Sequence, residues 1–356
     1  MPARPADDDT RGDLPNRGQR QGPASIQTAI DGAPAGATIN VARGTYQGDL
    51  EIVRSVHLVG DHAVIVPAAI PTTNLCQTPG FFGGVVGVCI HGVPSADFSS
   101  ITPISSVSFE GFTVRDFGGP GIVALGVDGL RLADMVTAHN GEMGMFINQV
   151  TSFSLRDSRS YDNHGDCVFM ENLREGSKDT NTVVTGNKSW DNLGSGIIFI
   201  NSLGGRIANN DLHGNCARIQ VWAFAGDYGS VSGDVSIRHN RVTANNRWCP
   251  ADGAGAPDYG GIGIGLIGAQ NTTVAHNDVR NNRARAGRAI PGGGIVIATL
   301  AEKADTNPAS NAPTGNSVRR NQLSGNTPFD IYGDGTGSAN TVSGNSCHTT
   351  NLGGAC

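Results

Sequence analysis

The most constraining feature of the sequence is a pair of asparagines, separated by four residues, that returns along the chain. The spacing occurs at Asn187/Asn192, Asn210/Asn215, Asn240/Asn245, Asn277/Asn282 and Asn321/Asn326, and two earlier copies keep only the second member, Asn140 and Asn163. Consecutive copies start roughly 23 residues apart, with insertions between some of them. A repeat of this length is typical of a solenoid, in which each unit stacks on the next.

The segments between the asparagines have the composition of short strands. They are four or five residues long, rich in Val, Ile and Phe, and bounded by Gly and Asn. Asparagine suits tight corners, and its amide can bond to the equivalent amide one coil away. We therefore predict an all-β chain folded as a right-handed parallel β-helix, with each coil adding about 4.8 Å along the axis.

The chain of 356 residues is expected to form one elongated domain over 23–356, because a solenoid grows by stacking. Residues 1–22 are polar and read as an unstructured leader. Ser25 can cap a short helix over 26–31 that would plug the open end of the solenoid. Residues 67–106 are predicted to form an irregular excursion covering one side, and 347–356 to form a C-terminal disulfide loop.

Cysteine usage and charge restrict the environment and the partners. The seven cysteines predict an oxidising compartment, with the pairs Cys76–Cys89, Cys216–Cys249 and Cys347–Cys356 and with Cys167 left over. No apolar run is long enough for a membrane span. Met1 begins no signal peptide, so the cysteines lead us to expect a secreted protein in mature or trimmed form, with a cytoplasmic protein as the alternative. The net charge of −6 and the scattered arginines argue against a nucleic-acid partner.

The first coil resembles a known family. The patterns are Ile26-Gln-x-Ala-Ile, Gly36-Ala-Thr-Ile-x-Val-x-x-Gly-Thr-Tyr, Leu50-x-Ile and Ser55-Val-x-Leu-x-Gly. They are similar to the opening of pectin-lyase-like right-handed β-helix proteins, whose repeats are of the PbH1 type, and the likeness extends over about 24–346. The resemblance implies the fold. It leaves function open among polysaccharide lyases, glycoside hydrolases, epimerases, adhesins and non-catalytic spacers.

One strand per repeat can be aligned to separate an inner from an outer face. The aligned first residues are Gly121, Gly144, Cys167, Gly196, Arg218, Gly263 and Gly294. Residues one and three positions later are apolar in every copy and are predicted to point inward, whereas the aligned residue and those two and four later should point outward. Three coils have distinctive outward sets, namely Gly144, Phe146, Asn148, then Cys167, Phe169, Glu171, and then Arg218, Gln220, Trp222.

Insertions near these strands would make walls around the outward residues. They fall at 171–182, 224–234, 249–262, 283–293 and 299–316. Long loops beside one rigid sheet form a groove, and aromatic side chains next to amides and carboxylates suit sugar rings. Two alternatives remain open: the loops could fold over the aromatics and bury them, and Asn148 could belong to an asparagine ladder.

A second resemblance is local. His164-Gly-Asp-Cys-Val is similar to the Asp-Asp-Cys-Val strand of polygalacturonase-type glycoside hydrolases, and Arg218-Ile-Gln is similar to their Arg-Ile-Lys. The order of the motifs agrees, yet of the three family aspartates only Asp166 is present. Met143 and Gly165 replace the other two, Ser195 replaces the histidine, and Gln220 replaces the lysine. Hydrolysis needs a second carboxyl group, which Glu142 or Glu171 could supply from shifted positions.

These observations predict a secreted carbohydrate-active protein that cleaves a polysaccharide or oligosaccharide by hydrolysis or elimination. The acid and base groups would be Asp166, Glu171 and Glu142, and the substrate would contact Asn148, Phe146, Phe169, Arg218, Gln220, Trp222 and His164. No cofactor is expected: no His/Cys cluster has zinc spacing, and no compact aspartate cluster indicates calcium. The alternative is a non-catalytic module that binds glycan or serves a structural or accessory role.

Overall fold

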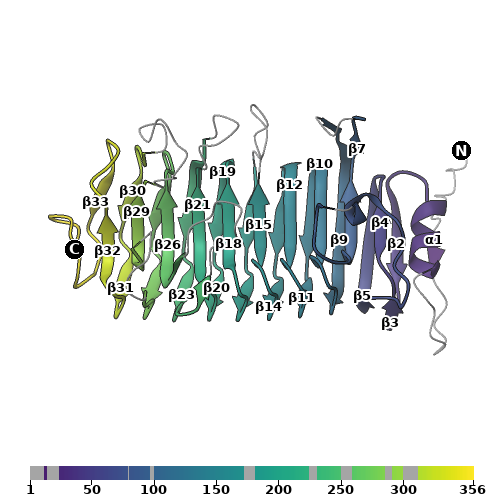
Figure 1. Cartoon of the computed structure of the whole chain (residues 1–356). Coiled ribbons are helices and arrows are strands. Elements are labelled where there is room, and N and C mark those ends of the chain that lie inside the picture. Colours follow the sequence, from purple (N-terminus) through teal and green to yellow (C-terminus); the bar gives the residue numbers. More distant parts are fainter. Residues whose placement is uncertain are drawn as a thin grey trace, which may run out of the picture.

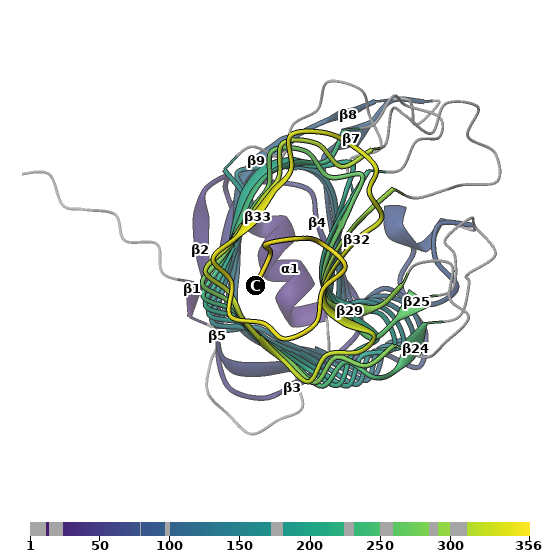
Figure 2. The ribbon, with the colours of Figure 1, turned by 90° about the vertical axis from the view of Figure 1, so that its left-hand side faces the viewer.

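The computed structural model describes residues 12–13, 24–78, 80–96, 100–171, 181–223, 231–249, 259–284, 291–299 and 312–356. Its strands wind into a parallel β-helix, which confirms the predicted fold class (Figure 1). Seen along the axis, the described coils have three flat faces joined by corners (Figure 2). We call them faces I, II and III, in the order in which the chain passes through them.

Face I is the sheet stacked from β4 to β32 in Figure 1. Its strands are β4 (Leu50–Ile52), β6 (Val88–His91), the first half of β10 (Ile122–Ala133), β12 (Met145–Thr151), β15 (Val168–Glu171), β18 (Ser195–Ile200), β21 (Ala217–Trp222), β26 (Ile262–Ile267), β29 (Gly293–Ala298) and β32 (Phe329–Gly333).

Face II follows face I along the chain. Its strands are β1 (Gly12–Asp13), β2 (Ala37–Val41), the first parts of β5 (Val56–Val66) and β9 (Ile104–Arg115), the second half of β10, β13 (Ser154–Arg156), β16 (Val183–Thr185), β19 (Leu203–Ala208), β22 (Gly233–Arg238), β27 (Thr273–Ala275), β30 (Ser317–Arg319) and β33 (Thr341–Ser343).

Face III closes each coil. It contains β3 (Thr45–Gln47), the ends of β5 and β9, β11 (Val136–Ala138), β14 (Arg159–Tyr161), β17 (Lys188–Trp190), β20 (Asp211–His213), β23 (Arg241–Thr243), β28 (Asp278–Arg280) and β31 (Gln322–Ser324). Outside the coils, β7 (Val93–Pro94) pairs with β8 (Ile101–Thr102), and β24 (Trp248–Cys249) pairs with β25 (Tyr259–Gly260), both antiparallel.

The core is the column of apolar side chains inside the coils. The register of face I places Ile122, Met145, Val168, Ile197, Ile219, Ile264 and Ile295 in one row. These residues, and those two positions later in each strand, are at most 4% exposed. The predicted inward pairs are therefore confirmed. Their burial gives each coil its apolar contact with the next, which is the main stabilising term in a solenoid.

Asparagines stack into the predicted ladders at the corners. Between faces II and III, the Nδ2 group of Asn187 donates to Oδ1 of Asn210 at 3.0 Å, and Asn210 donates to Asn240 at 2.9 Å. The row continues through Asn277 and Asn321 to Asn345. Each Oδ1 also accepts the backbone N–H of the preceding asparagine, so the ladder satisfies polar groups that the corner would otherwise leave buried and unpaired.

The left-handed backbone at these corners belongs to the residue before each ladder asparagine. His239 and His276, for example, have φ of 54° and 58°, and they precede Asn240 and Asn277. The ladder asparagines are almost completely buried, whereas the residue before them is at the surface. From the sequence, asparagine itself is expected both to adopt this backbone conformation and to form the ladder. The structure divides these tasks between two neighbouring residues.

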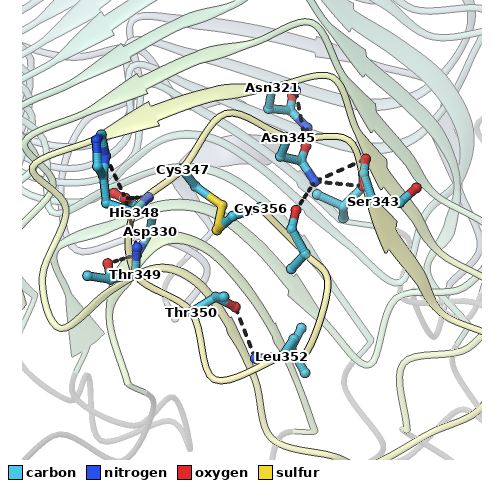
Figure 3. The surroundings of a disulfide bond; sticks show 12 residues. Asn321, Asp330, Ser343, Asn345, Cys347, His348, Thr349, Thr350, Leu352 and Cys356 are labelled. Atoms are coloured by element: carbon cyan, nitrogen blue, oxygen red, sulfur yellow. Dashed lines mark hydrogen bonds and ion pairs between the residues drawn. A yellow bond between two sulfur atoms is a disulfide. The ribbon is translucent and has the colours of Figure 1, made fainter.

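Both ends of the solenoid are covered. Helix α1 (Ala24–Gly32) lies across the N-terminal end, where Ile26 and Ile30 are buried against the core, as predicted (Figure 2). At the other end, Asp330 takes the place of a ladder asparagine, because its Oδ1 accepts Nδ2 of Asn326 at 2.8 Å. Its Oδ2 accepts the backbone N–H of His348 at 2.9 Å (Figure 3). The Cys347–Cys356 disulfide closes the loop over this end.

The predicted excursion over 67–106 does cover one side of the coils, but it also contains a regular strand. Strand β6 pairs with β4 and β10 in the middle of that range. The rest includes the 3-10 helix η1 (Leu75–Gln77), which the Cys76–Cys89 disulfide ties to β6.

Of the other cysteine predictions, the free Cys167 is confirmed and the pairing of Cys216 is tested only in part. Cys216 is disulfide-bonded, but the side chain of its predicted partner Cys249 lies outside the described residues. Cys167 is free and buried, as expected. In the predicted leader, Gly12 and Asp13 form β1 beside β2, and the remainder of 1–22 lies outside the described residues.

Candidate functional site

The outer surface of face I contains two straight rows of side chains. One row runs through Val123, Phe146, Phe169, Ile198 and Gln220, and the other runs through Leu125, Asn148, Glu171, Ile200 and Trp222. Members of a row are neighbours on adjacent strands, about 4.8 Å apart. Because the residues that alternate with these positions along each strand fill the barrel core, the positions themselves point away from it, as predicted.

Apolar packing covers both ends of this surface. Towards the N-terminus, Cys76, Val86 and Phe82 of the excursion pack over Val123, Leu125 and Phe146. Towards the C-terminus, Ile198, Ile200 and Trp222 form a second cluster with residues of later coils, and Phe169 packs against it. The polar pair Asn148 and Glu171 lies between the two clusters. The predicted walls at 171–182, 224–234, 249–262, 283–293 and 299–316 fall largely outside the described residues.

Glu171 is the distinctive ionisable group of this surface. It ends strand β15, is half-buried, and has no hydrogen bond or ion pair with another described residue. Removal of water from around the carboxylate disfavours its charged form, so burial raises the pKa of Glu171 to about 7. A carboxyl with a pKa near neutrality can both give and take a proton at physiological pH, as a general acid or base requires.

Asn148 is the register partner of Glu171 on the preceding strand. Its side chain is only 5% exposed, yet its amide makes no hydrogen bond with any described residue. It is therefore not a member of an asparagine ladder, which settles one alternative left open by the sequence. A buried amide normally finds a partner, so Asn148 is available to donate to and accept from a ligand beside Glu171.

Phe146 and Phe169 are stacked on each other rather than presented to solvent. Their ring centroids are 5.5 Å apart at an interplanar angle of 16°, and the rings of Phe82 and Phe146 form a T-shaped pair with centroids 5.3 Å apart. In such a ladder the ring faces point along the solenoid axis. A sugar ring would meet the edges of these rings, so the geometry does not provide the stacking platform that the sequence suggested.

Arg218 is turned into the barrel, contrary to the prediction. Its side chain is 0% exposed, and Nη2 donates to the backbone oxygen of Thr243 on face III. Burial lowers the pKa of this guanidinium well below its usual range. Cys167 also points inward, and burial raises the pKa of its thiol to about 11, which keeps it protonated and unreactive. Neither side chain reaches the outer surface of face I.

The aligned residue lies at the corner between faces III and I, where simple alternation fails. A Cβ added to Gly144 would meet Ser160 Oγ and Thr137 Oγ1, which are buried within the coil. The backbone turns at this position, so the side chain points inward although the strand that follows alternates regularly.

Two predicted carboxylates have structural partners. Asp166 Oδ1 accepts the backbone N–H of Ser195 at the corner of the next coil. Glu142 Oε1 accepts the backbone N–H of Gly83 and so holds the excursion against the coils. Glu142 precedes strand β12 and Glu171 ends β15, so the two carboxyls lie at opposite ends of face I. The structure does not bring Asp166, Glu142 and Glu171 together around one bond.

The remaining predicted residues are placed as follows. Gln220 and Trp222 are on the outer rows but are covered, at 0% and 1% exposed, and Gln220 Nε2 donates to Ser195 Oγ at 3.1 Å. Trp222 is therefore buried, but the described residues packed around it lie mainly on strands of face I rather than on loops. His164 is exposed at the corner before β15, away from Glu171 along the strand.

Sequence reasoning missed one polar pair on the same surface. His91 precedes Leu125 in the row that contains Asn148 and Glu171, and its Nε2 lies 2.9 Å from Oε1 of Glu51. The pair could not be found from the sequence because β6 lies inside the predicted excursion, where no repeat register can be assigned. Cys89 is close to this pair, but its sulfur is bonded to Cys76, so the cluster is unsuited to a metal.

Comparison with protein families identifies the class. Residues 100–307 match the model of the right-handed beta helix region, and because this match spans more than half of the chain, the protein belongs to that family. A search among curated proteins gave no match. In the described part of the chain, none of the helices has the length and apolarity that a membrane crossing requires.

Solved structures with the same fold cover nearly the whole chain. The A-module of mannuronan C-5 epimerase AlgE4 from Azotobacter vinelandii is 18% identical with a TM-score of 0.60, over 93% of this chain and 94% of the epimerase module. DFA-IIIase from Arthrobacter chlorophenolicus A6, in complex with GF2, is 15% identical with a TM-score of 0.52, over 94% and 93%. The Dettilon tailspike protein is 16% identical with a TM-score of 0.54, over 90% of this chain and 63% of the tailspike. At these identities the likeness shows the fold.

Proposed function

We propose that the protein acts on a polysaccharide bound along the outer surface of face I, and that it cleaves a glycosidic bond there with Glu171 as the proton-transferring group. The single observation that supports this most is the Glu171 carboxyl, which is unpaired among the described residues, partly desolvated and close to neutrality in pKa. Straight rows with a period of about 4.8 Å suit an extended polymer. We further propose that the protein works outside the cell, where its disulfides are stable.

In the hydrolytic form of this proposal, Glu171 in its protonated form donates its proton to the leaving oxygen of the scissile bond. A water molecule attacks the anomeric carbon and gives up its own proton to the solvent. Asn148, its neighbour in the row, binds a sugar hydroxyl with the amide that no described residue engages. The apolar clusters on either side exclude water and keep the local dielectric low, which sustains the raised pKa of Glu171. That the similar epimerase module is named for mannuronan, a polysaccharide, is compatible with this substrate class.

The test is incubation with a panel of neutral and acidic polysaccharides, following both new reducing ends and the absorbance of unsaturated uronates. The Glu171→Gln variant should lose activity about 100-fold or more, because positioned proton transfer contributes roughly 10²–10⁴. Wild-type activity should fall as pH rises through about 7, when the acid loses its proton. Glu110→Gln, at a surface glutamate on β9, is the matched control and should retain full activity.

A second candidate function is glycan binding without cleavage. It is favoured by the register, which gives Glu171 only Asn148 and Ile200 as strand neighbours, so no second carboxyl of the described residues stands beside it. Retaining and inverting hydrolysis both use two carboxyl groups. Folded protein that retards in polysaccharide gels but releases neither reducing ends nor unsaturated products would support this candidate over the first.

A further inference from the structure

A cluster of basic side chains lies at the corner between faces II and III, in the C-terminal half of the solenoid. It consists of Arg238, His239, His276, Arg319 and Arg320, and we call it the basic ridge. Arg238 ends β22, and Arg319 ends β30 two coils further on, with Ala275 as the register partner between them. His239, His276 and Arg320 occupy the positive-φ corner position in three successive coils.

The side chains of the ridge form an ordered row. The rings of His239 and His276 stack with centroids 5.3 Å apart and an interplanar angle of 6°. Both histidines and Arg320 are exposed, and Arg238 and Arg319 are half-buried. Because neighbouring coils are about 4.8 Å apart, Arg238 and the pair Arg319 and Arg320, two coils further on, place cationic groups about 10 Å apart along the axis.

No described carboxylate neutralises the ridge. Arg319 and Arg320 make no ion pair within the described part of the chain, and Nε of Arg238 donates to Ser236 Oγ. The closest acid along the sequence, Asp278, is paired with Arg280 on face III. Desolvation and then the charges of His239, Arg320, Arg238 and Arg319 lower the pKa of His276, so every charged group with a named effect on it is cationic.

Such an arrangement is unfavourable for the free protein. The three arginines repel one another with no acid paired to them, although a chain of net charge −6 has acids available. Several other surface arginines are paired with an acid, as Arg131 is with Glu110 and Arg43 is with Asp61. An unpaired row of cations on an acidic protein indicates that an anionic ligand supplies the missing charge.

We propose that the basic ridge binds the acidic groups of a carboxylated polysaccharide chain that runs along the solenoid axis. Guanidinium groups pair with carboxylates in a bidentate geometry, and a linear polymer offers a carboxylate at regular steps. A nucleic acid fits less well, because its recognition relies on a basic surface much broader than three arginines. The ridge is separate from Glu171: face I lies on the right of Figure 2, whereas faces II and III meet on the left.

This site goes beyond the proposed function, because it requires no catalysis at Glu171. The test uses the full chain and fluorescently labelled polygalacturonate oligomers, with affinity measured by anisotropy at low and at high salt. The triple variant Arg238→Gln/Arg319→Gln/Arg320→Gln should bind at least tenfold more weakly at low salt, and the difference should shrink at high salt as the charges are screened.

The matched control is Arg43→Gln/Arg115→Gln/Arg131→Gln, which removes the same charge from three exposed arginines that each pair with an acid elsewhere. This control should bind as the wild type does. Equal weakening in both triple variants would overturn the proposal, since it would show a response to net charge alone. The proposal would also be overturned if duplex DNA bound more tightly than polygalacturonate, or if uncharged dextran bound equally well.

Discussion

At the scale of single residues, the position of Glu171 affects stability as well as chemistry. Its carboxyl is half-buried without a partner among the described residues, and its pKa rises from the usual 4.5 to about 7. Below pH 4 the group is neutral in both the folded and the unfolded chain. Between about pH 4.5 and 7 the unfolded chain loses the proton first, so the free energy of unfolding decreases as pH rises, and it stays lower above pH 7.

Glu171→Gln should therefore change the pH dependence of stability. The amide cannot ionise, so the variant does not lose stability between pH 4.5 and 7. The difference in the free energy of unfolding between variant and wild type should therefore shift in favour of the variant by on the order of 1–3 kcal/mol from pH 4 to pH 8. Urea unfolding across this range measures the effect. Glu110→Gln, at a surface position, should follow the wild-type curve within about 0.5 kcal/mol. Parallel curves for Glu171→Gln and wild type would show that the carboxyl is solvated in the folded protein.

At the scale of strands and corners, the repeat determined what could be predicted. Inward residues such as Ile197 and Ile219 were identifiable because strands alternate with a period of two and the coils keep one register. Arg218 was misplaced because the backbone bends where the corner meets the strand, and alternation cannot be counted across a bend. The burial of Trp222 depends on contacts from other coils and could not be read from its own strand.

The polar pair of His91 and Glu51 could not be predicted from the sequence either. These residues come from β6 and β4, which are separated by a long irregular segment, so no repeat links their positions. Glu171, by contrast, was recognised as an outward residue because its strand fits the repeat. The raised pKa of Glu171 could not be predicted from the sequence, because it depends on burial by neighbouring clusters that form only in the packed structure.

The asparagine ladders supply a prediction at this scale. Asn240 is 1% exposed, its Nδ2 donates to Ile207 O and Asn277 Oδ1, and its own Oδ1 accepts from Asn210. Asn240→Ala leaves several buried groups unpaired at roughly 1–3 kcal/mol each, so we expect a loss of about 3 kcal/mol or more. Chemical denaturation measures it.

The matched control is Asn209→Gly, at the corner position directly before Asn210, which is the ladder neighbour of Asn240 in the preceding coil. Asn209 is exposed with φ of 56°, a geometry that glycine adopts freely, so the substitution should cost well under 1 kcal/mol. If the two variants lost similar amounts of stability, the ladder bonds would have no special weight, and the corners would depend on backbone geometry alone.

At the scale of the whole molecule, each coil contacts mainly the coil before and the coil after it. Stability is then a sum of local terms along the axis, and the ends are the weakest points unless they are covered. The C-terminal cover has several parts: Asn345 Nδ2 donates to Ala355 O at 3.1 Å, Leu352 packs against the core, and the Cys347–Cys356 bond holds the loop in place (Figure 3).

Removing that disulfide with Cys347→Ser/Cys356→Ser should loosen the molecule from this end. Closure of a loop with a sequence separation of 9 contributes about 2–3 kcal/mol in the chain-entropy view. Hydrogen exchange should accelerate first in β33 and β30 and leave β12 to β18 protected. The Cys76→Ser/Cys89→Ser variant is the control, because its bond ties the excursion to face I near the other end, and exchange in β33 should stay as in wild type. Uniform acceleration along all coils in the first variant would instead mean that the solenoid opens as one cooperative unit, with coupling reaching far beyond neighbouring coils.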